Sequence, residues 1–144
     1  MKAVKGVHLQ GLEDVQRALE VVTPRESKNI LRRTTLRVAQ QVRDQVKEKT
    51  PVKTGNLKRA IKAKRGRGDR TAVTATVVAD RSGGRSGKAY HWHLLEFGTV
   101  KMPAQPFISP TVEGMRGEVP GIYRREFGNE LEKEMQKRAK KAKK

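Results

Sequence analysis

The chain has 144 residues, no cysteine and a formal net charge of +18, from 33 basic and 15 acidic side chains. The absence of cysteine excludes disulfide bonds, thiolate metal sites and cysteine nucleophiles. The length suits a single domain, and the charge predicts attraction to polyanions, of which nucleic acid is the first to consider. Hydrophobic residues make up 35% of the chain, below the usual apolar share of about 45–50%, so we expect partner subunits to supply part of the stability.

A short amphipathic helix is predicted over residues 11–22. Its apolar side chains recur at helical spacing: Leu12, Val15, Leu19 and Val22. A second, longer helix is predicted to begin at Thr23 and Pro24, because Glu26 occupies the capping-box position three residues after Thr23. We expect this helix to end by Thr50, since the residue before a proline is pushed out of the helical region. Its narrow apolar stripe consists of Leu31, Thr34 or Thr35, Val38, Val42 and Val46.

A β-hairpin is predicted in the middle of the chain. Residues 52–56 form a turn-rich connector in which Gly55 can take a positive φ cheaply. Residues 57–65 give a mixed signal that we interpret as a strand, with a helical turn at its start as the alternative. Residues 66–70 are typical of a turn, and residues 71–80 are rich in β-branched side chains.

A flexible basic loop is predicted over residues 81–88, which contain no apolar side chain to anchor them. Its cations, Arg81, Arg85 and Lys88, are candidates for contact with a partner subunit or with DNA.

The last third of the chain is predicted to be irregular and then helical. Residues 89–99 hold half of the aromatic side chains (Tyr90, Trp92 and Phe97) and should return to the core as a strand or a short helix leading into Gly98. We expect Pro103, Pro106 and Pro110 to break regular structure. The apolar positions beyond Pro110 repeat at helical spacing in two stretches, so we predict a C-terminal helix with a kink or break near Pro120.

No active site is predicted. His91, His93 and Glu96 form only a weak metal-binding pattern, and we favour two ordinary surface or interface histidines. No serine has a nucleophile-elbow context, and no carboxylate pair suits acid–base chemistry. We therefore expect no enzyme activity, no cofactor and no metal. No run approaches the roughly 18 apolar residues of a membrane span, so we expect no membrane partner.

Two motifs are far more specific than these patterns. The first is T-P-V-K-T-G-N-L-K-R-A-I over residues 50–61, and the second is H-L-L-E-F-G-T followed by M-P-A-Q-P-F-I-S-P over residues 93–110. Together they resemble the tail-completion, or head–tail joining, family of long-tailed phages, whose members also occur in prophages and gene transfer agents. The motif positions in this chain are Thr50, Pro51, Thr54, Gly55, Leu57, Ile61, Glu96, Phe97, Gly98, Thr99, Pro103, Ala104, Pro106, Phe107 and Pro110.

The resemblance implies a structural virion protein, assembled in the bacterial host, that forms a ring at the neck of the particle. It implies a homo-oligomer, a hexamer in this family, between the head connector or stopper proteins and the tail tube or tail terminator protein, with non-specific contact to the DNA in the channel. The basic C-terminus and the Pro120–Gly121 pair depart from the family pattern, which leaves the use of the C-terminal helix open.

The expected fold class is α+β, with a small antiparallel sheet packed on the long helix of the N-terminal half and a C-terminal helix. We divide the chain into one domain over residues 1–136 and a basic tail over residues 137–144. Glu96 lies among apolar residues, so it should accept hydrogen bonds from backbone or arginine donors and fix Gly98 and Thr99. Phe107 should fill the core ahead of the last helix.

Two other functions compete with the ring subunit. A stand-alone basic nucleic-acid-binding protein would use the charge and the lysine-rich tail, and it would bind duplex DNA as a monomer with steep salt dependence. A metal-dependent nuclease would also suit the charge, but it needs clustered carboxylates, and only Glu96 is a candidate.

Overall fold

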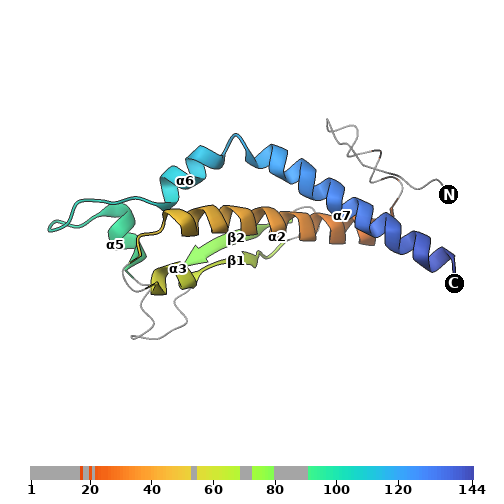
Figure 1. Ribbon diagram of the computed structural model, residues 1–144, viewed down its shortest axis with the longest axis horizontal. Helices are drawn as coiled ribbons and strands as arrows, with labels where there is room; N and C mark the ends of the chain where they lie inside the picture. The colour runs from red at the N-terminus through yellow and green to blue at the C-terminus, as the bar shows by residue number, and fades with distance from the viewer. Residues whose placement is uncertain (1–16, 18–19, 21, 53–54, 69–72, 80–90) are drawn as a thin grey trace.

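The protein forms an α+β structure built around one long helix. The computed structural model describes residues 17, 20, 22–52, 55–68, 73–79 and 91–144. Helix α2 (Pro24–Lys49) lies between a two-stranded sheet and an arm made of helices α6 (Ile108–Met115) and α7 (Val119–Ala142) (Figure 1). The predicted α+β class, with a sheet on a long helix and a C-terminal helix, is confirmed.

Helix α2 begins and ends at the predicted residues. The Thr23 hydroxyl accepts from the Glu26 N–H at 3.3 Å, and the Thr23 N–H donates to the Glu26 carboxylate at 2.8 Å. This capping box satisfies N–H groups that the first turn leaves without an intrahelical partner. At the other end Thr50 is extended, and its hydroxyl donates to the Val46 carbonyl at 2.7 Å.

The buried side of α2 contacts two separate hydrophobic clusters. Near its start, Val22 and Ile30 pack with Phe127 and Leu131 of α7. Near its end, Val46 packs with Ile61 and Phe107. The predicted stripe is correct at Thr34, Val38 and Val46, which are buried. Leu31 and Val42 are partly buried and pack against the two clusters, and Ile30, which the predicted stripe did not include, is fully buried.

The hairpin is confirmed, with shorter strands than the sequence predicts. Strand β1 (Ile61–Arg65) pairs antiparallel with β2 (Ala75–Ala79), and Ala63 lies opposite Val77. Residues 57–60 belong to helix α3 (Asn56–Ala60), so the helical-turn alternative is correct for the start of this segment. Gly55 precedes α3 with φ of +75°, a left-handed conformation that glycine adopts easily.

The C-terminal arm is broken as predicted, but a few residues earlier. The break lies at residues 116–118, and Pro120 sits in the first turn of α7. A first-turn proline removes no hydrogen bond, because that N–H has no partner within the helix. Pro110 was also expected to break regular structure. It instead lies in the first turn of α6, where it removes no hydrogen bond and does not break the helix.

Several predictions fall on residues outside the described ranges. These are most of the helix expected over residues 11–22, Thr54 of the first motif, and the loop of residues 81–88 with Arg81, Arg85 and Lys88. The proposed boundary between residues 136 and 137 stays a prediction, and α7 runs across it to Ala142. Among the residues that are described, no helix is long and apolar enough to cross a membrane.

Candidate functional site

The two halves of the second motif are joined by the carboxylate of Glu96. Glu96 lies on the short helix α5 (Trp92–Phe97) and is only 5% exposed. Its Oε2 accepts from the N–H groups of Phe107 at 2.9 Å and Ile108 at 3.0 Å. Its Oε1 accepts from the N–H of Ser109 at 2.8 Å and from the Ser109 hydroxyl. Glu96 therefore caps the N-terminus of α6 from another element of the chain.

These hydrogen bonds keep Glu96 ionised. Burial alone would raise the pKa of its carboxyl. The Ser109 hydroxyl and the N–H groups of Ile108, Ser109 and Phe107 outweigh that effect and lower the pKa to about 2. The positive end of the α6 dipole favours the same charge. At neutral pH Glu96 is therefore a buried negative charge that backbone donors hold in place.

This finding corrects part of the prediction for Glu96. Backbone donors are confirmed, but they belong to residues 107–109, so Glu96 fixes the start of α6, whereas Gly98 and Thr99 are held by backbone hydrogen bonds to Leu94 and Met102. Ser109 was missed as a partner. Its position next to Pro110, in a segment that starts a helix, is a signal that sequence reasoning could have used.

Gly98 and Thr99 begin a tight turn directly after α5. Gly98 has φ of +73° and ψ of 177°, a region that is essentially open to glycine alone. A Cβ at this position would lie 2.7 Å from the Ala104 nitrogen. The Thr99 N–H donates to the Met102 carbonyl at 2.8 Å, and the Gln105 N–H donates to the Leu95 carbonyl at 2.7 Å. The turn is thus fixed against α5 by its own backbone.

The first motif meets the second in the hydrophobic cluster below this turn. Phe107 is buried and packs with Ile61 of the first motif and with Val46 of α2, as the sequence predicted for Phe107. Leu57, Trp92 and Leu95 pack around these three residues. The two motifs are distant in sequence but form one structural unit, which we call the motif joint: residues 50–52, 55–61 and 92–110 with Val46.

The surface of the motif joint carries exposed apolar side chains. Phe97 is 73% exposed at the end of α5, and Val100 at the tip of the turn is fully exposed. Pro103, Ala104 and Pro106 are exposed beside them. Large apolar side chains held outward on a rigid backbone are typical of a surface that binds another protein. We call Phe97 and Val100 the apolar tip.

A cluster of charged residues joins α2 to α7. The sequence analysis did not predict it. Glu130 is 2% exposed and lies 2.7 Å from Arg37 Nε, 3.3 Å from Arg33 Nε and 3.4 Å from Lys133 Nζ. Arg33 also contacts Glu134 at 2.8 Å. The sequence signal was the near balance of acidic and basic residues between Glu113 and Glu134, opposite a basic stretch of α2.

The weak metal-binding pattern does not form a cluster. His91 and His93 flank the start of α5, while the Glu96 carboxylate faces the backbone of residues 107–109. Over the described part of the chain, no group of three or more histidine, aspartate or glutamate side chains could hold a metal ion.

The fold holds two exposed apolar side chains, Phe97 and Val100, at the end of the motif joint. Residues 13–98, more than half of the chain, match the family described as "Bacteriophage HK97-gp10, putative tail-component". The chain belongs to this HK97-gp10-like family. Its members are phage tail components, which makes this chain a structural protein of the virion and places it in a class that is generally non-enzymatic. No curated protein and no solved structure matches the chain.

Proposed function

We propose that this protein is a ring-forming head–tail joining subunit at the neck of a long-tailed phage or a phage-like gene transfer particle. Its ring, a hexamer, connects the head connector or stopper proteins to the tail tube or tail terminator protein. DNA passes through the ring. Family membership supports a tail location, and the sequence motifs favour the neck within it.

The apolar tip is the observation that carries this proposal. Phe97 and Val100 face solvent in the monomer, on a turn that backbone hydrogen bonds hold against α5. Such side chains suit a ring subunit, because the free energy of association depends on a few well-held apolar side chains. We assign the apolar tip to the contact with the neighbouring subunit of the ring.

The first test is the mass of the purified protein, alone and mixed with its genomic neighbours, by light scattering and native mass spectrometry. We expect a hexamer, or a monomer that becomes one on a tail-tube partner. The variants Phe97→Ser and Val100→Ser should weaken that assembly, whereas Val112→Ser, which changes an exposed valine on α6, should not.

The second test is a deletion strain, in which filled heads and separate tails should accumulate. Normally joined particles in that strain would contradict the neck assignment. A protein that stays monomeric with every neighbour and still binds DNA tightly would instead support the stand-alone nucleic-acid-binding alternative.

A further inference from the structure

Two arginines at the end of the hairpin lack a counter-charge. Arg32 on α2 and Arg65, the last residue of β1, are both exposed. Neither side chain has a hydrogen-bond or ion-pair partner in the part of the chain that the structure describes. Arg33 and Arg37 on α2 differ in this respect, because Glu130 of α7 pairs with both of them. Arg32 and Arg65 are therefore available to bind an acidic group of another molecule.

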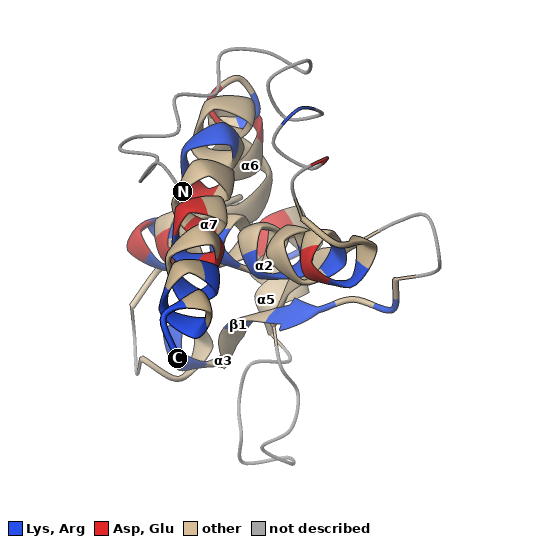
Figure 2. Ribbon diagram, turned by 90° about the vertical axis from the view of Figure 1, so that its right-hand side faces the viewer, with Lys and Arg blue, Asp and Glu red and all other residues tan. Residues whose placement is uncertain are grey.

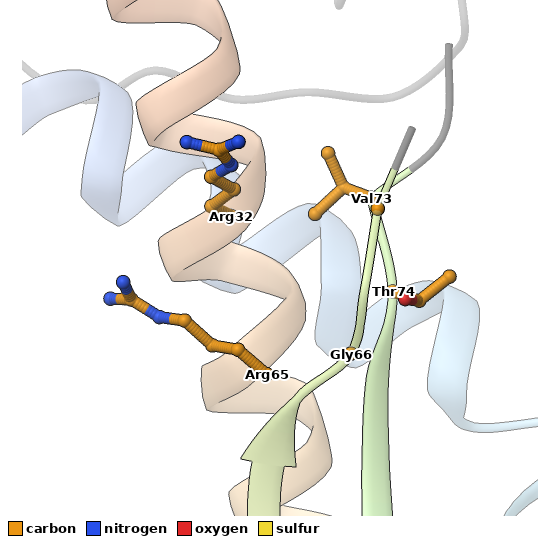
Figure 3. Close-up of a pocket in the computed structure, with 6 residues that line it drawn as sticks. Arg32, Arg65, Gly66, Val73 and Thr74 are labelled. Carbon is orange, nitrogen blue, oxygen red and sulfur yellow. The ribbon is translucent and has the colours of Figure 1, made fainter. Parts of the chain in front are cut away.

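The strand register places both arginines at one cavity. Side chains alternate along a strand, so Ile61 and Arg65 of β1 project from the same face of the sheet. Ile61 is buried in the cluster that contains the end of α2, so this face is the one turned toward α2. There Arg65 and Arg32 line a cavity of about 170 Å³. In Figure 3 both guanidinium groups extend away from Val73 and Thr74, which line the same cavity.

The backbone that carries Arg65 is held in place by the hairpin. The Gly66 N–H donates to the Thr74 carbonyl at 2.9 Å, which continues the pairing one residue beyond Arg65 and Ala75. A Cβ at Gly66 would collide with the Thr74 side chain, so this close pairing favours glycine. A binding group on a fixed backbone loses less conformational freedom when it binds. Arg65 is thus partly preorganised for a ligand.

The lining of the cavity favours a protein carboxylate over the phosphates of DNA. A guanidinium group matches the paired oxygens of either ligand. Non-specific binding to duplex DNA, however, depends on contacts with several phosphates at once, and lysine supplies them as well as arginine. This cavity is lined by two arginines and an apolar side chain, Val73, and by no lysine among the described residues. Arginine is enriched at protein interfaces, where lysine is depleted.

A matching carboxylate lies on the opposite side of α2. Glu118 belongs to the break between α6 and α7, residues 116–118, which we call the elbow. Glu118 is exposed, and its carboxylate has no hydrogen-bond or ion-pair partner among the described residues. Arg125 lines the same cavity as Glu118 but donates to Gln41 at 3.4 Å. Figure 1 and Figure 2 both show the elbow on one side of α2 and the sheet on the other, and Figure 2 shows the Lys and Arg colour on β1.

The positions of these groups suit a contact between copies of the chain. Neighbouring subunits of a ring meet through heterologous contacts, so each subunit needs two different surfaces that complement each other. The arginine pair and Glu118 have opposite charge and lie on opposite sides of one helix. They therefore cannot pair within one copy, but they can pair between two.

We infer that Arg32 and Arg65 of one copy bind the Glu118 carboxylate of the next copy in the ring. The inference rests on the proposed function, because it takes the ring as given. It adds a charged contact to the apolar one that Phe97 and Val100 provide. The two contacts use different residues, so they can be tested separately.

The experiment is a charge exchange in the full chain, under the conditions in which the wild type forms the hexamer. Arg65→Glu and Glu118→Arg are made singly and together, and assembly is followed by light scattering and native mass spectrometry. Arg67→Glu is the matched control for the first change, because Arg67 is exposed on the same hairpin and does not line the cavity. Glu48→Arg is the control for the second, because Glu48 is exposed on α2, away from the elbow. Thermal unfolding verifies that each variant is folded.

We expect each single exchange to raise the protein concentration at half-assembly by about tenfold or more, because it sets like charges against each other. The double variant should recover most of the wild-type assembly, and both controls should assemble as the wild type does. Unchanged assembly in the single variants would overturn the inference, as would a double variant that is no better than either single one. If Arg65→Glu kept the hexamer and instead lost affinity for duplex DNA, the cavity would be a phosphate site and the inference would be wrong.

Failure of this inference can be told from failure of the proposed function. If the charge exchange has no effect while Phe97→Ser still weakens the hexamer, the ring stands and only the pairing of Glu118 with the arginines is wrong. If the wild type forms no hexamer, alone or with any genomic neighbour, both the ring and the pairing are contradicted.

Discussion

The two buried carboxylates in the described part of the chain are stabilised in opposite ways. Glu96 in the motif joint is held by backbone N–H groups and one hydroxyl, all within a three-residue segment. Glu130 on α7 is held by three cations that come from two helices. Backbone donors are fixed in direction by the fold, whereas long side chains reach from many positions. Glu96 therefore fixes where α6 begins relative to α5, and Glu130 joins α7 to α2.

The largest effect should come from Glu96→Ala. The substitution leaves the N–H groups of residues 107–109 without their acceptor, and orphaned buried donors cost about 1–3 kcal/mol each. We expect the free energy of unfolding to fall by about 3–4 kcal/mol in urea titrations. Glu96→Gln keeps one acceptor oxygen and should lose about half as much. Wild-type stability in Glu96→Ala would show that the joint is held by apolar packing alone.

Lowering the pH should remove the contribution of Glu96 to the free energy of unfolding. The folded-state pKa of Glu96 is about 2, below its ordinary value of 4.5. Its stabilisation is therefore complete above about pH 4.5 and is lost as the pH falls toward 2. The urea midpoint should drop less between pH 6 and pH 3 in Glu96→Gln than in the wild type. Glu26, whose pKa is also about 2 because of the Thr23 N–H and then Arg138, is unchanged in both proteins and cancels in the comparison.

Gly98→Ala should be the next most damaging change. The backbone conformation at Gly98 is closed to other residues, and the new Cβ would lie 2.7 Å from the Ala104 nitrogen. We expect a loss of about 2–3 kcal/mol in thermal unfolding. Gly55→Ala is the matched control, because Gly55 has a similar φ with nothing within 4 Å of the new Cβ, and it should cost only about 1 kcal/mol. Equal losses would mean that contact with Ala104 is unimportant.

Glu130→Ala should cost less than Glu96→Ala, although both carboxylates are buried. The side chains of Arg33, Arg37 and Lys133 are 33%, 48% and 54% exposed, so they can turn to water when their partner is lost. We expect a loss of about 1–2 kcal/mol in urea titrations, below the cost of orphaning a fully buried charge. Glu130→Met should be closer to the wild type. If Glu130→Ala and Glu96→Ala lost equal stability, the conclusion that the two carboxylates are stabilised in different ways would be contradicted.

The smallest effect should come from Thr23→Ala at the start of α2. The substitution removes the hydroxyl that accepts from the Glu26 N–H, a change that typically costs about 1 kcal/mol. Thermal unfolding followed by circular dichroism at 222 nm is sensitive enough to detect it. Thr23→Ser keeps the hydroxyl and should restore most of the loss, and its failure to do so would assign the effect to the methyl group.

Local signals in the sequence predicted the fold well where the responsible residues are close together. The capping box at Thr23 and Glu26, the stop at Thr50, and the turn and β-branched residues that predict the hairpin all act within a few residues. The starting point of β1 was less certain, because Leu57 and Ile61 suit a helix and a strand equally. Only the burial of Ile61 against Val46 and Phe107 separates the two.

The site was predictable in its membership but not in its geometry. The motif identified Glu96, Gly98 and Phe107, and its apolar surroundings indicated that the carboxylate needs donors. Which donors it finds depends on how α6 returns to α5, a contact across 11 to 13 residues that no local pattern encodes. The Glu130 cluster is harder still, since its arginines lie 93 or more residues away in the chain.

The length of α2 has a mechanical consequence for any assembly that contains this protein. Its 26 residues form one uninterrupted helix, which corresponds to a strut of about 39 Å. The turn after α5 lies beyond one end of the strut, and the C-terminus of α7 projects beyond the other (Figure 1). The two ends of the molecule are therefore kept at a fixed separation, so a force applied at one end is transmitted to the other and is not absorbed by bending.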